Sequence, residues 1–81
     1  MKTVKLFTSP TCGPCRMVKP ILKKLESEGT VVEYIDITED LDSTEKYSIN
    51  SVPTIIINEE GSEIYRHTGM ITINKLKEKL I

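Results

Sequence analysis

The chain has 81 residues, of which 38% are hydrophobic and 28% charged, and its formal net charge is -1 at pH 7. This length predicts one domain over residues 1–81, and the composition argues against a disordered chain. The near-zero charge gives no electrostatic basis for binding nucleic acid, and no apolar run approaches the roughly 20 residues of a membrane span. The first residues also lack a signal-peptide pattern, so we expect a cytoplasmic protein with reduced thiols.

The first predicted elements are a strand and a helix. Val4 to Thr8 is rich in β-forming residues and apolar on both faces, as in a central strand covered on both sides. From Gly13 the apolar residues change to helical spacing, and Gly29 provides the stop. Pro20 lies inside this helix and predicts a bend, because it removes one backbone hydrogen bond. The predicted apolar face comprises Met17, Val18, Ile21, Leu22 and Leu25.

The middle of the chain predicts a second strand and a short helix. Residues 31–37 alternate in the manner of a strand. Residues 40–47 predict a helix that Asp40 or Thr38 would cap. This helix has only two large apolar residues, so we expect it to be the least secure element.

The last third predicts a hairpin followed by a helix. Residues 51–57 form an apolar strand opened by Pro53, residues 58–61 form the turn, and residues 63–67 form the returning strand. The short turn makes these two strands antiparallel. The final lysine-rich helix has one apolar stripe that would pack on the sheet. This stripe comprises Ile71, Ile73, Leu76 and Leu80.

The order of elements is strand, helix, strand, helix, hairpin, helix. A right-handed crossover makes the first two strands parallel neighbours, and helices on both faces bury the apolar strands. The sequence therefore predicts an α/β fold with a four-stranded mixed sheet between helices.

The segment Cys12-Gly13-Pro14-Cys15 carries the chemistry. It places two thiols at the first turn of a helix, where unpaired backbone N–H groups and the helix dipole stabilise a thiolate. Cys12 occupies the N-cap position, and Pro14 lies in the first turn, where its missing N–H costs no helical hydrogen bond. We therefore predict an exposed, reactive Cys12 and a less exposed Cys15.

Two cysteines at this spacing can also be half of a zinc site. Such a site needs four ligands, and this chain offers two cysteines and a distant His67. We favour redox chemistry and expect no metal.

Two segments resemble the thioredoxin superfamily. Residues 7–17, Phe-Thr-Ser-Pro-Thr-Cys-Gly-Pro-Cys-Arg-Met, are similar to its active-site segment, and Pro20 matches its helix-kinking proline. Residues 46–54 are similar to the segment that carries the family's cis-proline, and Gly69 matches the glycine after its last strand. The resemblance spans nearly the whole chain and implies the thioredoxin fold.

The resemblance also implies which residues meet a substrate. It implies that the Val52–Pro53 bond is cis and faces Cys12, which leaves the Val52 backbone free to pair with an extended substrate. The expected substrate-contacting residues are Thr11, Gly13, Pro14, Val52, Pro53 and Gly69.

The sequence departs from the family pattern at three positions. Thr11 stands where thioredoxins usually carry Trp, Leu6 where they carry a buried Asp, and Val32 near their paired Lys. The usual proton acceptor for Cys15 is therefore absent. Glutaredoxins usually show a Gly-Gly pair followed by Asp after the last strand, and residues 68–71 lack both features.

The resemblance implies a thiol-disulfide oxidoreductase that reduces protein disulfides by dithiol exchange. Cys12 is the expected nucleophile and Cys15 the resolving thiol, with no cofactor beyond their own disulfide. Thioredoxin reductase or glutathione is the expected electron donor, ribonucleotide reductase is a candidate client, and we expect a monomer. The alternatives are a glutathione-dependent glutaredoxin-type reductase and a non-catalytic thioredoxin-like binding module.

Overall fold

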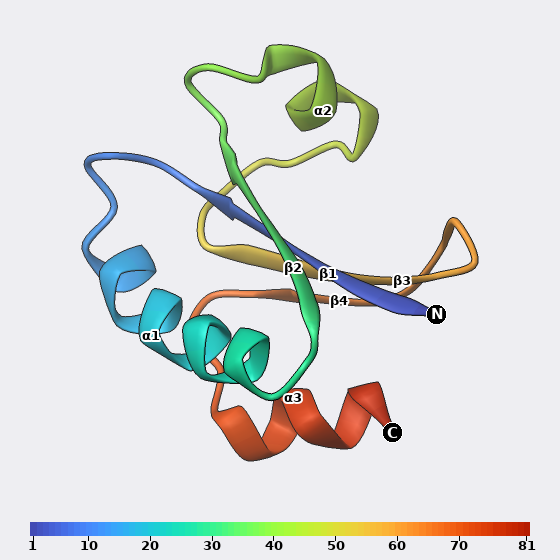
Figure 1. Cartoon of the computed structure of the whole chain (residues 1–81). Coiled ribbons are helices and arrows are strands. Elements are labelled where there is room, and N and C mark those ends of the chain that lie inside the picture. The colour runs from blue at the N-terminus through green and yellow to red at the C-terminus, as the bar shows by residue number, and fades with distance from the viewer.

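The computed structural model describes residues 1–81 as one four-stranded sheet with three helices. In chain order the elements are β1 (Lys2–Thr8), α1 (Gly13–Ser27), β2 (Val31–Asp36), α2 (Leu41–Lys46), β3 (Thr54–Glu59), β4 (Ser62–Thr68) and α3 (Ile73–Leu80). The strand order is β2-β1-β3-β4, with β1 parallel to β2 and the other two pairs antiparallel. The helices α1 and α3 lie on one face of the sheet and α2 on the other (Figure 1). The predicted α/β architecture is confirmed, with β1 as an inner strand.

The helix α1 begins and ends as predicted, but its buried face differs. Cys12 is its N-cap, and Gly29, with φ of +99°, follows its last turn in the left-handed conformation that glycine adopts most readily. Met17 was assigned to the buried face, and this prediction is wrong because its side chain is 65% exposed. It lies about 100° around the helix from buried Val18, on the edge of the apolar face. The buried face comprises Cys15, Val18, Leu22 and Leu25.

The short helix α2 is held by its cap. The side chain of Asp40, rather than that of Thr38, accepts the backbone N–H of Ser43 at 3.0 Å. No residue of α2 is buried, and Leu41 is 67% exposed. Capping and flanking residues therefore position this helix more than burial of its own side chains does.

The hairpin turn is tighter than the sequence predicted. Only Glu60 and Gly61 lie between the strands, with φ values of +52° and +83°, a pairing of conformations that suits a two-residue hairpin loop. Asn58 and Glu59, predicted to be turn residues, still pair with β4. β3 also starts at Thr54, later than predicted.

The helix α3 packs on the same face of the sheet as α1 (Figure 1). The hydroxyl of Thr72 caps it by accepting the backbone N–H of Lys75 at 3.2 Å, and Leu76 is fully buried. None of the three helices combines the length and the apolar character needed to cross a membrane.

The core is divided between the two faces of the sheet. The α2 face holds a small buried cluster of Phe7, Ile35 and Ile56. The face under α1 and α3 holds a larger cluster, which comprises Val4, Leu6, Val18, Leu22, Leu25, Ile55, Ile57, Ile71 and Leu76. The helix that carries both cysteines therefore rests on the larger cluster.

Candidate active site

Three segments meet at one end of the sheet. The end of β1, the start of β3 and the end of β4 lie together, beside the beginning of α1 (Figure 1). The strand register agrees, because Phe7 pairs with Thr54 and Thr54 pairs with Thr68. Just beyond these pairs, the backbone N–H of Gly69 donates to the carbonyl of Pro53 at 2.8 Å. The sheet therefore brings two predicted substrate-contacting residues to the end where β1 leads to the cysteines.

The two cysteines form a disulfide with their Cα atoms 5.3 Å apart. The sulfur of Cys12 also accepts the backbone N–H of Cys15 at 3.1 Å, so it satisfies one of the unpaired amides at the helix start. Cys15 is only 1% exposed, whereas Cys12 is partly exposed. The predicted difference in exposure is confirmed, and a substrate approaching from solvent reaches Cys12 first.

The electrostatic surroundings of Cys12 favour negative charge. The first turn of α1 contains no acidic residue, and the exposed Arg16 lies within this turn without forming an ion pair. The helix dipole adds partial positive charge at the same point. These groups stabilise a thiolate on Cys12 when the disulfide is reduced.

The face of the sheet under α1 is apolar at Leu6 and Val32. Leu6 is fully buried in the larger cluster, and Val32 packs against that cluster. Apolar side chains therefore stand at the positions where thioredoxins usually carry an acid and a lysine.

Val52 offers an unpaired backbone beside this site. Neither its N–H nor its C=O takes part in a hydrogen bond, while its side chain packs against the smaller cluster of Phe7, Ile35 and Ile56. The Val52–Pro53 peptide bond is cis, as the resemblance implied. Val52 can therefore present its backbone groups to an extended chain while its side chain stays anchored.

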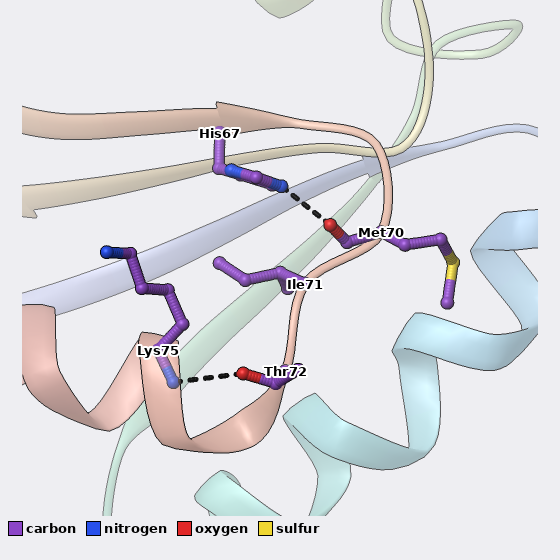
Figure 2. Close-up of a pocket in the computed structure, with 5 residues that line it drawn as sticks. All are labelled: His67, Met70, Ile71, Thr72 and Lys75. Atoms are coloured by element: carbon purple, nitrogen blue, oxygen red, sulfur yellow. Dashed lines mark hydrogen bonds between the residues drawn. The ribbon is translucent and has the colours of Figure 1, made fainter.

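A pocket of about 400 Å³ lies beyond Gly69, lined by His67, Met70, Ile71, Thr72 and Lys75. Figure 2 shows that the Met70 side chain extends toward α1, away from the ring of His67. The Nε2 of His67 lies 2.7 Å from the Met70 carbonyl, which accepts its hydrogen when this nitrogen is protonated. Neither cysteine lines the pocket, so the pocket is separate from the disulfide.

Sequence reasoning missed one feature of this rim. Met70 is 47% exposed beside Gly69, and Met17, which the helical spacing places on the buried face, is 65% exposed. Flexible, polarisable methionine side chains adapt to varied apolar surfaces. One sequence signal could have identified Met17 as exposed. It follows Cys15 by two residues and lies at the edge of the apolar face, not at its centre.

The family model described as Thioredoxin matches residues 2–81. The chain belongs to the thioredoxin family. The thioredoxin of Chlamydia trachomatis is 37% identical over 79 residues, covering 93% of this chain and 72% of that protein. The thioredoxin of Methanocaldococcus jannaschii is 32% identical over 80 residues, covering 95% of this chain and 94% of the relative. The thioredoxin of Chlamydia pneumoniae is 38% identical over 66 residues, and the match spans 65% of its length.

A solved thioredoxin structure confirms the fold. A mutant thioredoxin from Halobacterium salinarum superimposes with a TM-score of 0.91 and 25% identity, covering 96% of this chain and 70% of that one. The thioredoxin fold and the Cys12–Cys15 disulfide at its helix start make this chain a thiol-disulfide oxidoreductase. No three His, Cys, Asp or Glu side chains are grouped so that they could hold a metal ion.

Proposed function

We propose that this thioredoxin reduces disulfide bonds in other proteins, with Cys12 as nucleophile and Cys15 as resolving thiol. The observation that carries the proposal is the unequal exposure of the two sulfurs. The Cys12 thiolate attacks one sulfur of the client disulfide, which forms a mixed disulfide and releases the other client sulfur as a thiolate. Cys15 then attacks Cys12, so the second client sulfur leaves with the electron pair.

The short connection between the cysteines makes the second step efficient. Both lie at the start of α1, with Cα atoms 5.3 Å apart, so the attack of Cys15 is intramolecular. A fixed geometry of this kind replaces a bimolecular encounter and gives a high effective concentration.

The client lies against the segments that surround Cys12. The free N–H and C=O of Val52 pair with an extended client segment in the manner of an added β-strand. Thr11 is exposed and small, which leaves room for the client beside Cys12. The other residues that we assign to client contact are Gly13, Pro14, Pro53 and Gly69.

The cysteine variants test the assignment of roles. We expect Cys12→Ser to lower the reduction of insulin by dithiothreitol to the rate of dithiothreitol alone. We expect Cys15→Ser to accumulate a one-to-one mixed disulfide with a client, because the resolving attack is removed. Ser27→Ala, at the far end of α1, is the control and should match the wild-type rate. Reduction that persists in Cys12→Ser contradicts the proposal.

The electron donor requires its own experiment. We propose a flavin-dependent thioredoxin reductase as donor, ribonucleotide reductase as a client, and a monomer in the cytoplasm that needs no cofactor beyond its disulfide. Residues 68–71 lack the Gly-Gly pair and the following Asp with which glutaredoxins hold glutathione. Turnover of the Cys12–Cys15 disulfide by a purified thioredoxin reductase supports this donor. Faster turnover by glutathione, dependent on Cys12 alone, supports the glutaredoxin-type alternative.

A further inference from the structure

Thr8, the last residue of β1, carries a buried hydroxyl with no partner. The residue is 6% exposed, and its Oγ1 is the only buried side-chain oxygen or nitrogen that forms no hydrogen bond. Its backbone carbonyl is satisfied, because it accepts the N–H of Ile37 at 2.9 Å. Buried hydroxyls in native proteins are nearly always paired, so this exception calls for a physical reason.

The strand places Thr8 on the face that α1 covers. Alternate residues of β1 point to the same face, so Thr8 shares the face of Val4 and Leu6, which belong to the same cluster as Val18 and Leu22 of α1. The chain reverses between β1 and α1, so the end of the strand lies near the start of the helix (Figure 1).

The spacing along the two elements places Thr8 closer than Leu6 to the end of the sheet where α1 begins. Two residues along a strand advance about 7 Å, which corresponds to between four and five residues of helix. Cys15 lies on the same buried face of α1 as Val18 and Leu22, nearest the start of the helix. Thr8 therefore lies one such step beyond Leu6, toward the disulfide.

The charged residue opposite Thr8 on the adjacent strand forms its hydrogen bonds within its own turn. Asp36 of β2 lies opposite Thr8 in the parallel register. Its Oδ1 accepts both the backbone N–H and the hydroxyl of Thr38, at 2.8 and 2.6 Å. The sulfur of Cys15, buried near the start of the helix that covers this face, is the acceptor that we consider, and it becomes a stronger acceptor once reduction turns it into a thiolate.

We propose that the Thr8 hydroxyl donates a hydrogen bond to the Cys15 sulfur when the disulfide is open, and so stabilises the attacking thiolate. This inference rests on the proposed function of Cys15 as resolving thiol. In the step, the bond between Cys15 and Cys12 forms, the bond between Cys12 and the client sulfur breaks, and the client sulfur leaves with the electron pair. The proton that Cys15 gives up ends on that client thiolate, and Thr8 keeps its own proton. Thr8 thus assists the thiolate where Leu6 supplies no acid.

The exchange equilibrium with dithiothreitol tests this assignment. Thr8→Val keeps the shape of the side chain and removes the hydroxyl. The substitution removes an unpaired buried hydroxyl from the oxidised form and a hydrogen bond from the reduced form. We therefore expect the equilibrium constant for exchange with dithiothreitol to shift about tenfold toward the oxidised protein. Thr8→Ser keeps the hydroxyl and should restore the wild-type equilibrium.

Thr54→Val is the matched control. Thr54 is also a buried threonine of this sheet, but its hydroxyl already donates to the Ser51 carbonyl at 2.7 Å. Its loss should weaken the oxidised and reduced forms alike and leave the exchange equilibrium unchanged. A shift in Thr54→Val equal to that in Thr8→Val would contradict a specific link between Thr8 and the cysteines.

Release of the client provides the second readout. We expect a preformed mixed disulfide on Cys12 to resolve more slowly in Thr8→Val than in the wild type, with recovery in Thr8→Ser. An unchanged equilibrium and release rate in Thr8→Val overturn the inference. If Cys15→Ser traps the client while Thr8→Val is unchanged, only the role of Thr8 fails. If Cys15→Ser traps nothing, the proposed function itself fails.

Discussion

The two faces of the sheet support the site in different ways. The face under α1 and α3 buries nine residues in one cluster, whereas the α2 face buries three. Both faces draw on the same strand, because Ile55 and Ile57 point to the larger cluster and Ile56 to the smaller. The cysteines start the helix that rests on the larger cluster, and the Val52 side chain packs on the smaller. The helix that carries the nucleophile therefore rests on the larger cluster, and the client-binding segment rests on the smaller one.

This difference suits the two tasks. A thiol that must attack a second sulfur on the same turn requires fixed geometry, which a tightly packed core provides. A segment that accepts clients of varied sequence benefits from a layer with few buried contacts, since such regions open at low free energy. The following predictions test whether packing separates the faces in this way.

The largest expected effect comes from two consecutive residues of β3. Ile55 and Ile56 are both fully buried, but they face opposite clusters. Substitution by alanine costs the transfer free energy of the lost atoms plus a cavity term, and the cavity term is smaller where the surroundings can collapse. We expect Ile55→Ala to lower the free energy of unfolding by about 4 kcal/mol and Ile56→Ala by about 2 kcal/mol, measured by urea denaturation.

The pair is its own control, because strand, residue type and burial are shared. Equal losses for the two variants would mean that the α2 face is packed as rigidly as the other. A larger loss for Ile56→Ala would reverse the comparison.

A smaller effect is expected at the aromatic contact on the α2 face. The rings of Phe7 and Tyr47 lie with centroids 5.6 Å apart at an interplanar angle of 58°. We expect Tyr47→Leu to lower the free energy of unfolding by about 1 kcal/mol, since such pairs contribute roughly this amount beyond burial. Amide exchange at Ile49, whose N–H donates to the Thr44 carbonyl at 2.9 Å, should also accelerate.

Tyr65→Leu is the comparison on the other face. Tyr65 packs against the larger cluster and has no aromatic partner there. We expect a smaller loss of stability than for Tyr47→Leu and no change at the Ile49 amide. The same acceleration of amide exchange at Ile49 in both variants would indicate that the α2 face opens whenever the whole protein is destabilised.

The spacing of apolar residues was sufficient to predict the helices and strands. It failed to predict the burial or pairing of individual residues at their edges. Apolar spacing located β1, α1 and the hairpin, because each period is set by backbone geometry. Met17 sits at the edge of the helical face, where spacing alone does not separate core from rim. Asn58 and Glu59 have the composition of a turn, but their pairing with β4 depends on the register of the whole hairpin.

The cysteines could be predicted from sequence more fully than their surroundings. Their spacing and the capping position of Cys12 follow from local rules, and the structure confirms that Cys15 is the more buried. Thr8 gave no sequence signal, because a threonine at the end of a strand is ordinary. Only its burial without a hydrogen-bond partner distinguishes it.

The smallest expected effect is the response of α2 to acid. The backbone N–H of Ser43 donates to the Asp40 carboxylate and holds the pKa of that side chain below its ordinary value. A carboxyl group with a depressed pKa in the folded state contributes stability above its unfolded pKa, and this contribution is lost as the pH falls through the folded pKa. We therefore expect α2 to loosen first as the pH drops below about 4, seen as NMR shift changes at Ser43 and Thr44. The start of α1, which has no acidic residue, should not respond.

Asp40→Asn separates charge from capping. Asparagine caps a helix about as well as aspartate but does not titrate in this range, so the acid response at Ser43 should disappear while the helix remains. The pKa of Asp36 is also lowered, by its hydrogen bonds from Thr38, so acid could loosen the turn that leads into α2 as well. A response that persists in Asp40→Asn and vanishes in Asp36→Asn would move the weak point from the cap to that turn. The first outcome places the acid-sensitive point at the cap of α2, whereas the second places it at the end of β2, where Asp36 lies opposite Thr8 of β1.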